Sequence, residues 1–246
     1  MLASGGAAFT CASADFDGTN DYMTRAAALT GIANGKKGIF STWVRFDGGD
    51  ATLQRLISSG GFWTVYKSAA NKIFFECVGT PSGSFSATCN TTTLTADGLW
   101  HHIGLSWDMD FIAGSKLCDA YIDGTLQSTT KVDADAAFNI DYAGPTNFGV
   151  GANVVGTQKI NGVLAEFYFN TVSYLALATN LTLFRTTGGK PVNLGSTGAT
   201  PTGTAPIVYQ RIATGGAATD FATNLGSGGN LTIAGTLDLG SSNPSD

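Results

Sequence analysis

Charged side chains are scarce in this sequence. Asp, Glu, Lys and Arg make up 13% of its 246 residues, where roughly a quarter is usual. Long amphipathic helices need a charged face, so this composition argues against a helical protein. The net charge of −5 makes nucleic acid and anionic membrane surfaces poor partners, and we expect neither. No stretch approaches the roughly 20 apolar residues that a membrane span needs.

Residues that hold metals or carry catalysis are also few. The two histidines are adjacent, and no two of the four cysteines have Cys-x-x-Cys spacing, so a zinc site is not expected. The opening MLASGGAAFT lacks the charge and the apolar run of a signal peptide. We therefore expect reduced, buried thiols, although an even number of cysteines also allows disulfides. These cysteines are Cys11, Cys77, Cys89 and Cys118.

Alternation of apolar and polar residues is the strongest positive pattern. It is clearest in Phe40–Phe46, Trp100–Trp107 and Val163–Phe169, and a period of two is typical of strands with one buried face. The dipeptide Asp123-Gly124 favours a tight hairpin turn. Further strand-like segments follow at short intervals between turns. We predict an all-β protein built as an antiparallel two-sheet sandwich, with a closed barrel as the alternative.

The composition changes at about Ser173. Leu175–Phe184 can form a short helix, and strands are expected at Pro206–Arg211 and Leu231–Leu239 within residues rich in Gly, Thr and Pro. We predict a sandwich over residues 1–172. Residues 173–246 are predicted to form an extension that packs on the sandwich or on neighbouring subunits.

Several short motifs occur in an order that resembles a known family. They are FDGTNDY at Phe16–Tyr22, FSTWVRF at Phe40–Phe46, WHHIGLSWD at Trp100–Asp108, AYIDG at Ala120–Gly124, FGVG at Phe148–Gly151 and INGVLAEFYF at Ile160–Phe169. The set resembles the concanavalin A-like lectin/glucanase superfamily, in its laminin G-like and pentraxin-like branch. This resemblance implies a jelly roll of two antiparallel sheets, one of them concave.

The C-terminal third is similar to segments that follow such domains in tailed-bacteriophage proteins. That similarity implies a virion protein that is assembled in the bacterial cytoplasm and has capsid or tail subunits as partners, in a homo-oligomer or symmetric array. We therefore expect a non-enzymatic structural role, as a capsid decoration or a tail-attached accessory protein. The alternative is a carbohydrate-binding module that recognises host surface polysaccharide.

The resembled superfamily includes glucanases, so hydrolysis of glycosidic bonds is a possible activity to test against the sequence. Cleaving a glycosidic bond needs two carboxyl groups, which the glucanase branch places on alternate residues of one strand. The matching strand here contains Glu166 alone, and Glu76 and Asp119 are likewise single. No serine lies in a Gly-x-Ser-x-Gly pattern. We expect no enzymatic activity.

Two candidate binding sites follow from the resemblance. A sugar would need exposed aromatic side chains, and the candidates are Trp63, Tyr66 and Phe74, although aromatic residues in strands more often belong to a core. No cofactor is required. Calcium is an option because related domains often bind it through loop carboxylates; the same residue types also favour turns. The calcium candidates are Asp15, Asp17, Asn20, Asp21, Asp108 and Asp110.

Overall fold

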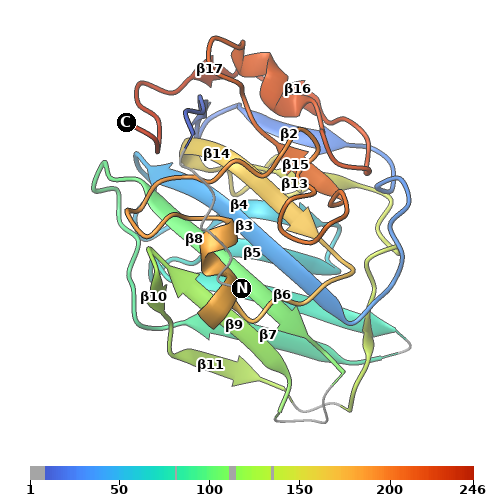
Figure 1. Cartoon of the computed structure of the whole chain (residues 1–246). Helices are drawn as coiled ribbons and strands as arrows, with labels where there is room; N and C mark the ends of the chain where they lie inside the picture. Colours follow the sequence, from blue (N-terminus) through green and yellow to red (C-terminus); the bar gives the residue numbers. More distant parts are fainter. Residues whose placement is uncertain (1–8, 81, 111–114, 134–135) are drawn as a thin grey trace.

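Two antiparallel sheets pack face to face (Figure 1). The computed structural model describes residues 9–80, 82–110, 115–133 and 136–246. Strands predominate in this part of the chain, and the helices are only three to five residues long. The predicted all-β sandwich of the jelly-roll type is therefore confirmed.

The first sheet contains the three segments with the clearest alternation, side by side. Its order is β10-β9-β8-β3-β14-β1-β17, and β15 pairs with β14. The strands are β1 (Ala14–Asp17), β3 (Lys37–Phe46), β8 (His101–Asp108), β9 (Leu117–Ile122), β10 (Thr125–Leu126), β14 (Asn161–Asn170), β15 (Val208–Gln210) and β17 (Asp238–Leu239).

The second sheet carries the groove described below. Its order is β11-β7-β6-β5-β4-β13-β2-β16, and β12 pairs with β6. The strands are β2 (Tyr22–Arg25), β4 (Gln54–Ser59), β5 (Trp63–Lys67), β6 (Ile73–Thr80), β7 (Ser84–Cys89), β11 (Thr129–Val132), β12 (Asn139–Ile140), β13 (Phe148–Val150) and β16 (Thr232–Ala234).

Aromatic side chains fill the space between the sheets. Trp107 from the first sheet stacks on Phe75 from the second, with 4.0 Å between ring centroids, and its indole N–H donates to the hydroxyl of Tyr142 at 2.7 Å. Each such buried ring contributes roughly 1.5–3 kcal/mol. The four cysteines are buried and free. Hydrophobic burial, and no disulfide, holds the sheets together.

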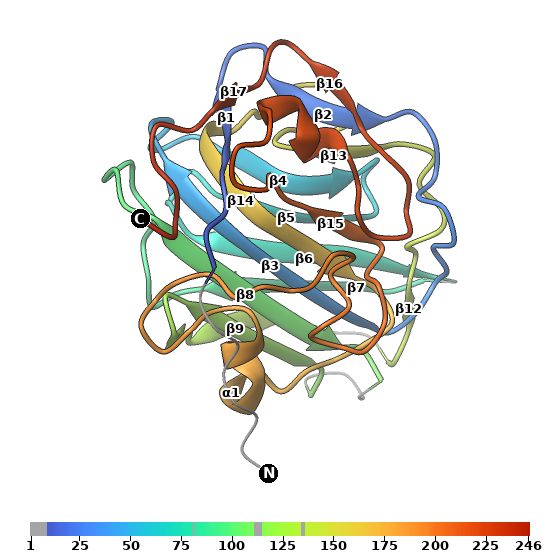
Figure 2. The ribbon, with the colours of Figure 1, turned by 45° about the horizontal axis from the view of Figure 1, so that its top comes forward.

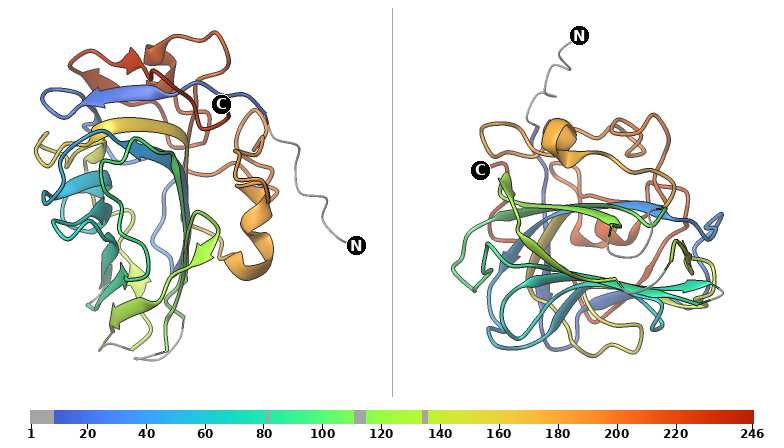
Figure 3. Two further views of the ribbon diagram at one scale, coloured as in Figure 1. Left: turned by 90° about the vertical axis from the view of Figure 1, so that its left-hand side faces the viewer. Right: turned by 90° about the horizontal axis from the view of Figure 1, so that it is seen from below.

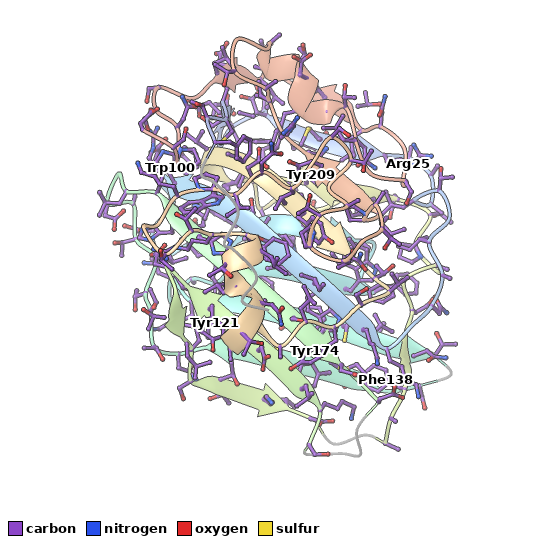
Figure 4. The ribbon with its side chains drawn as sticks, in the orientation of Figure 1. Arg25, Trp100, Tyr121, Phe138, Tyr174 and Tyr209 are labelled. Carbon is purple, nitrogen blue, oxygen red and sulfur yellow. The ribbon has the colours of Figure 1, made fainter. Side chains whose placement is uncertain are left out.

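Residues 173–200 form a third layer on the outer face of the first sheet (Figure 3). They include α1 (Leu177–Asn180) and the 3₁₀ helix η1 (Leu181–Leu183), whereas the 3₁₀ helix η2 (Ala218–Ala222) packs on the core between the sheets. Figure 4 labels Tyr121, Tyr174 and Tyr209 on this face. The apolar cluster beneath the layer comprises Ile39, Tyr168, Leu177, Phe184, Val192, Leu194 and Tyr209. None of the helices in the described residues is long and apolar enough to span a membrane.

The last strands close one side of both sheets (Figure 2). β16 pairs with β2 in the second sheet, whereas β17 pairs with β1 in the first. The prediction of one continuous strand over Leu231–Leu239 is therefore wrong. Gly235 breaks it, because its φ of 79° turns the chain and only glycine adopts such an angle without strain.

Candidate functional site: a groove on the outer face of the second sheet

The outer face of the second sheet bears a groove of about 490 Å³. Alternation along β5 directs Trp63 and Val65 into the core, so Thr64 and Tyr66 face outward. The groove is lined by Arg55, Ser58, Ser59, Gly60, Gly61, Phe62, Trp63, Thr64, Glu76, Cys77, Val78, Ser84, Phe85, Ser86, Val132, Asn153 and Val154. Its volume lies within the roughly 300–1,000 Å³ usual for small-molecule sites.

Strand register places five of these lining residues in one row across the sheet. Ser58 on β4 is opposite Thr64 on β5, and Thr64 is opposite Glu76 on β6. Glu76 is opposite Ser86 on β7, and Ser86 is opposite Val132 on β11. Short polar side chains therefore form most of the floor of the groove.

An aromatic and charged cluster lies beside this row. Tyr66 and Phe74 stack with 5.1 Å between ring centroids, and the Tyr66 hydroxyl donates to Oε1 of Glu76 at 2.7 Å. The guanidinium of Arg55 lies over the Tyr66 ring, 5.4 Å from its centroid. Burial, and then the bond to Glu76, raises the pKa of Tyr66, so the phenol stays a proton donor.

Arg55 is fixed by its neighbours. Its Nε donates to Oε1 of Gln158 at 2.6 Å, and its Nη1 donates to Oγ1 of Thr64 at 2.7 Å. Within the described residues, Nη2 of Arg55 and Oε2 of Glu76 have no hydrogen-bond partner. The groove thus offers a held donor and a held acceptor to a ligand that carries hydroxyl groups.

The three predicted sugar-binding residues have different positions. Tyr66 and Phe74 lie beside the groove, but Tyr66 is 8% exposed and acts through its hydroxyl group rather than as an open stacking surface. The prediction for Trp63 is corrected, because its side chain is only 3% exposed. Its ring stacks on Phe169 inside the core, with 4.5 Å between ring centroids. Trp63 and Tyr66 are three residues apart, and an odd spacing in a strand puts side chains on opposite faces.

Sequence reasoning missed Arg55, Thr64, Glu76 and Ser86 as groove residues. The signal was the spacing itself, because Thr64 and Glu76 each lie two residues from a predicted aromatic on the same strand. Ser86 becomes a neighbour of Glu76, and Arg55 a neighbour of Tyr66, only through strand register. Register between strands that are separated by loops is not visible in alternation alone.

The calcium candidates do not form one site. Oδ1 of Asp17 accepts the backbone N–H groups of Thr19, Asn20 and Asp21, which is turn geometry. These bonds outweigh burial and lower the pKa of Asp17. Asp15 lies near Asp47 at the end of β3, and burial, followed by that neighbour, raises its pKa.

The other two calcium candidates lie at the opposite end of β3. Asp108 pairs with Lys37 at 3.3 Å, and Asp110 pairs with Lys36 at 2.6 Å; the latter bond lowers the pKa of Asp110. Lysine ammonium groups already balance these carboxylates. Among the described residues, no cluster of three or more His, Cys, Asp or Glu side chains is placed to hold a metal ion.

Glu166 lies in the other sheet, away from the groove. It is 3% exposed at a bulge in β14 with a φ of 48°, where it accepts a hydrogen bond from the Tyr209 hydroxyl at 2.7 Å. In the part of the chain that the structure describes, its Oε1 has no hydrogen-bond partner. Burial raises the pKa of Glu166 to about 7. This carboxyl group cannot reach a ligand in the groove.

The two histidines lie at the start of β8 in the first sheet. His102 is fully buried beside Trp43, with Nε2 2.9 Å from Oγ of Ser41, and burial lowers its pKa to about 3. His101 lies between Asp123 and Asp97. Burial acts to lower the pKa of His101, but the aspartates raise it on balance. Both contacts are structural.

Comparisons with solved structures agree with this fold. The chain is similar to a candidate carbohydrate-binding protein from Bacteroides ovatus, with a TM-score of 0.60 and 10% identity, over 94% of this chain and 59% of that protein. It is also similar to the heptameric SAP-like pentraxin from Limulus polyphemus, with a TM-score of 0.55 and 10% identity, over 94% of both chains. At this identity the likeness shows the fold alone. The chain spans about three fifths of the length of the Bacteroides protein.

Sequence comparison places the chain in a family. No curated protein sequence matches it. A family model described as the concanavalin A-like lectin/glucanases superfamily matches residues 17–174, which is more than half of the chain. The protein therefore belongs to the concanavalin A-like lectin/glucanases superfamily.

Proposed function

We propose that the protein binds carbohydrate, without cleaving it, in the groove on the second sheet. The observation that carries this proposal is the row of short polar side chains beside the Arg55–Tyr66–Glu76 cluster, on the face opposite the layer of residues 173–200. The description of the Bacteroides protein as carbohydrate-binding supports the same reading.

The chemistry of the groove suits a neutral sugar. Its described lining contains one cation, Arg55, and one anion, Glu76. Sugar hydroxyls both donate and accept, so such a pair can hold two neighbouring hydroxyls, and hydrogen bonds to charged groups contribute roughly 1.5–3 kcal/mol each. A polyanionic glycan would meet the Glu76 carboxylate and a protein of net charge −5. We therefore propose a neutral glycan.

The carboxyl groups support binding rather than hydrolysis. Glycosidases place two carboxyl groups across the scissile bond. Among the described residues that line the groove, Glu76 is the only carboxylate, and Oε1 of Glu76 is taken by Tyr66. A non-enzymatic role is part of the proposal.

A glycan array followed by calorimetry tests this function. We expect neutral glycans to bind and Ser86→Trp to abolish binding, because the indole would fill the groove beside Glu76. Thr130→Trp is the matched control, since Thr130 lies on the adjacent strand outside the lining. No binding to any neutral glycan, or equal binding by both variants, would contradict the proposal.

The place of action is a separate proposal based on the C-terminal resemblance. We propose that the protein is carried on a phage virion, at the capsid or the tail, where glycan binding would serve adsorption to host polysaccharide. Repeated copies would add avidity to weak single sites. Copurification with capsid or tail particles in a fixed ratio would support this location. Recovery only as a free protein would argue against it.

A further inference from the structure

The two ends of the groove differ. Its floor crosses β4, β5, β6, β7 and β11, and four interstrand steps of about 4.8 Å give a row about 19 Å long. Exposure rises along this row: Ser58 is 4% and Thr64 is 7% exposed, whereas Val132 at the other end is 63% exposed. A groove open along its whole length would not show this gradient.

A loop closes the groove at the β4 end. Residues 152–158, here called the end loop, follow β13, which is the strand next to β4. A Cβ on Gly149 would lie 2.9 Å from the carbonyl oxygen of Ala152, so the loop folds directly over the strand beyond Ser58. Oγ of Ser58 donates to that same carbonyl at 3.1 Å.

The end loop is held firmly. Oδ1 of Asn153 accepts the backbone N–H groups of Val155 and Thr157, at 3.1 and 2.8 Å. Gln158 receives Nε of Arg55 on its side chain and the Arg55 backbone N–H on its carbonyl oxygen. Asn153 and Val154 line the groove. The loop is therefore a fixed wall.

We propose that the groove receives the end of a glycan chain and not an internal stretch of it. This inference rests on the proposed function. The terminal sugar lies against Asn153 and Val154, within reach of Arg55, Thr64 and Ser58. The following sugars pass over Glu76 and Ser86 and leave across Val132, at the exposed edge strand β11. A chain that continued in both directions would collide with the end loop.

Competition by chain length tests this inference. The probes are linear malto-, manno- and galacto-oligosaccharides of one to six sugar units, with amylose, mannan and galactan as the matching polymers. If the site binds chain ends, the polymer competes in proportion to its molar concentration of ends, so at equal mass it is weaker by the ratio of chain lengths. If polymer and oligomer compete equally at equal mass, internal stretches bind, and the inference fails while the proposed function stands.

A pair of variants in the end loop gives a second readout. Val154→Trp fills the closed end, and we expect at least tenfold weaker binding for every chain length. Val155→Trp is the matched control, because Val155 is 72% exposed and does not line the groove. Wild-type affinity in Val154→Trp, together with loss of binding in Ser86→Trp, would overturn end recognition alone. Absence of binding by all three sugar series and by every neutral glycan of the array would overturn the proposed function as well.

Discussion

At the scale of single residues, Arg55 links the end loop to the floor of the groove. Its guanidinium bonds Gln158 and Thr64 at once, which a lysine ammonium cannot reproduce, because the fork geometry belongs to arginine. We expect Arg55→Lys to weaken glycan binding about tenfold or more, equivalent to about 1.4 kcal/mol, in calorimetric titration. Arg25→Lys is the control, since Arg25 bonds Ala28 and Asn230 outside the groove. Equal affinity in both variants would remove Arg55 from the site.

The buried Glu166 makes stability depend on pH. The pKa of Glu166 is about 7 in the folded chain against an ordinary 4.5, so between these values the folded state holds a proton that the unfolded state has lost. The stability contributed by Glu166 is therefore full below pH 4.5 and is lost as pH rises through 7, by about 3 kcal/mol in total.

Glu166→Gln should lose this dependence. Urea unfolding of both proteins at pH 4.5 and pH 8 measures it. We expect the free energy of unfolding of the variant, relative to that of wild type, to rise by up to about 3 kcal/mol from pH 4.5 to pH 8. The reason is that glutamine has no proton to lose. Other titrating groups, His102 among them, are present in both proteins and cancel in the comparison. A difference that does not change with pH would show that Glu166 is already ionised in the fold.

At the scale of elements, the central strands were predictable and the groove was not. β3, β8 and β14 each contain long alternating runs that identified them as strands, but nearly every residue in them is buried, because the outer face of this sheet is covered as well as the inner one. Which outward face stays open depends on where residues 173–200 lie, and their Gly- and Thr-rich sequence has no period that gives this position. Trp63 was misplaced for a related reason. An alternating strand shows that two faces exist, but β5 has an aromatic residue on each face, so the alternation does not show which face is buried.

One glycine in β14 permits the close pairing of β14 with β3. A Cβ on Gly162, whose φ is 155°, would lie 2.2 Å from the carbonyl oxygen of Arg45. We expect Gly162→Ala to destabilise the fold by about 2–4 kcal/mol in urea unfolding. Gly31→Ala is the control: its φ of 71° is also positive, but nothing lies within 4 Å, so about 1 kcal/mol is expected. Similar losses for both would place the cost in the backbone angle rather than in the contact.

At the scale of the whole molecule, residues 173–246 are part of the packed structure. They supply β15 and β17 to the first sheet and β16 to the second, and they cover the apolar side chains of Ile39 and Tyr168. We expect a chain that ends at residue 172 to aggregate, because it exposes this apolar face and the unpaired edges of β1, β2 and β14. Soluble yield and light scattering measure the effect.

A shorter truncation is the control for that prediction. Ending the chain at Gly240 keeps all described strands and removes only residues 241–246, where Ser242 accepts hydrogen bonds from Arg45 and Trp100. We expect this chain to stay soluble with a modest loss of stability. If the chain ending at residue 172 were equally soluble and monomeric, the sandwich would be independent of its extension.

The pairing of β1 has a consequence for biosynthesis. β1 lies between β14 and β17, so Asp15 finds its partners only at Val163 and Asp238. β1 is therefore synthesised long before β14 and β17, the two strands that flank it. Such distant pairing folds slowly, and the nascent chain must remain unaggregated until Asp238 and Leu239 have been synthesised.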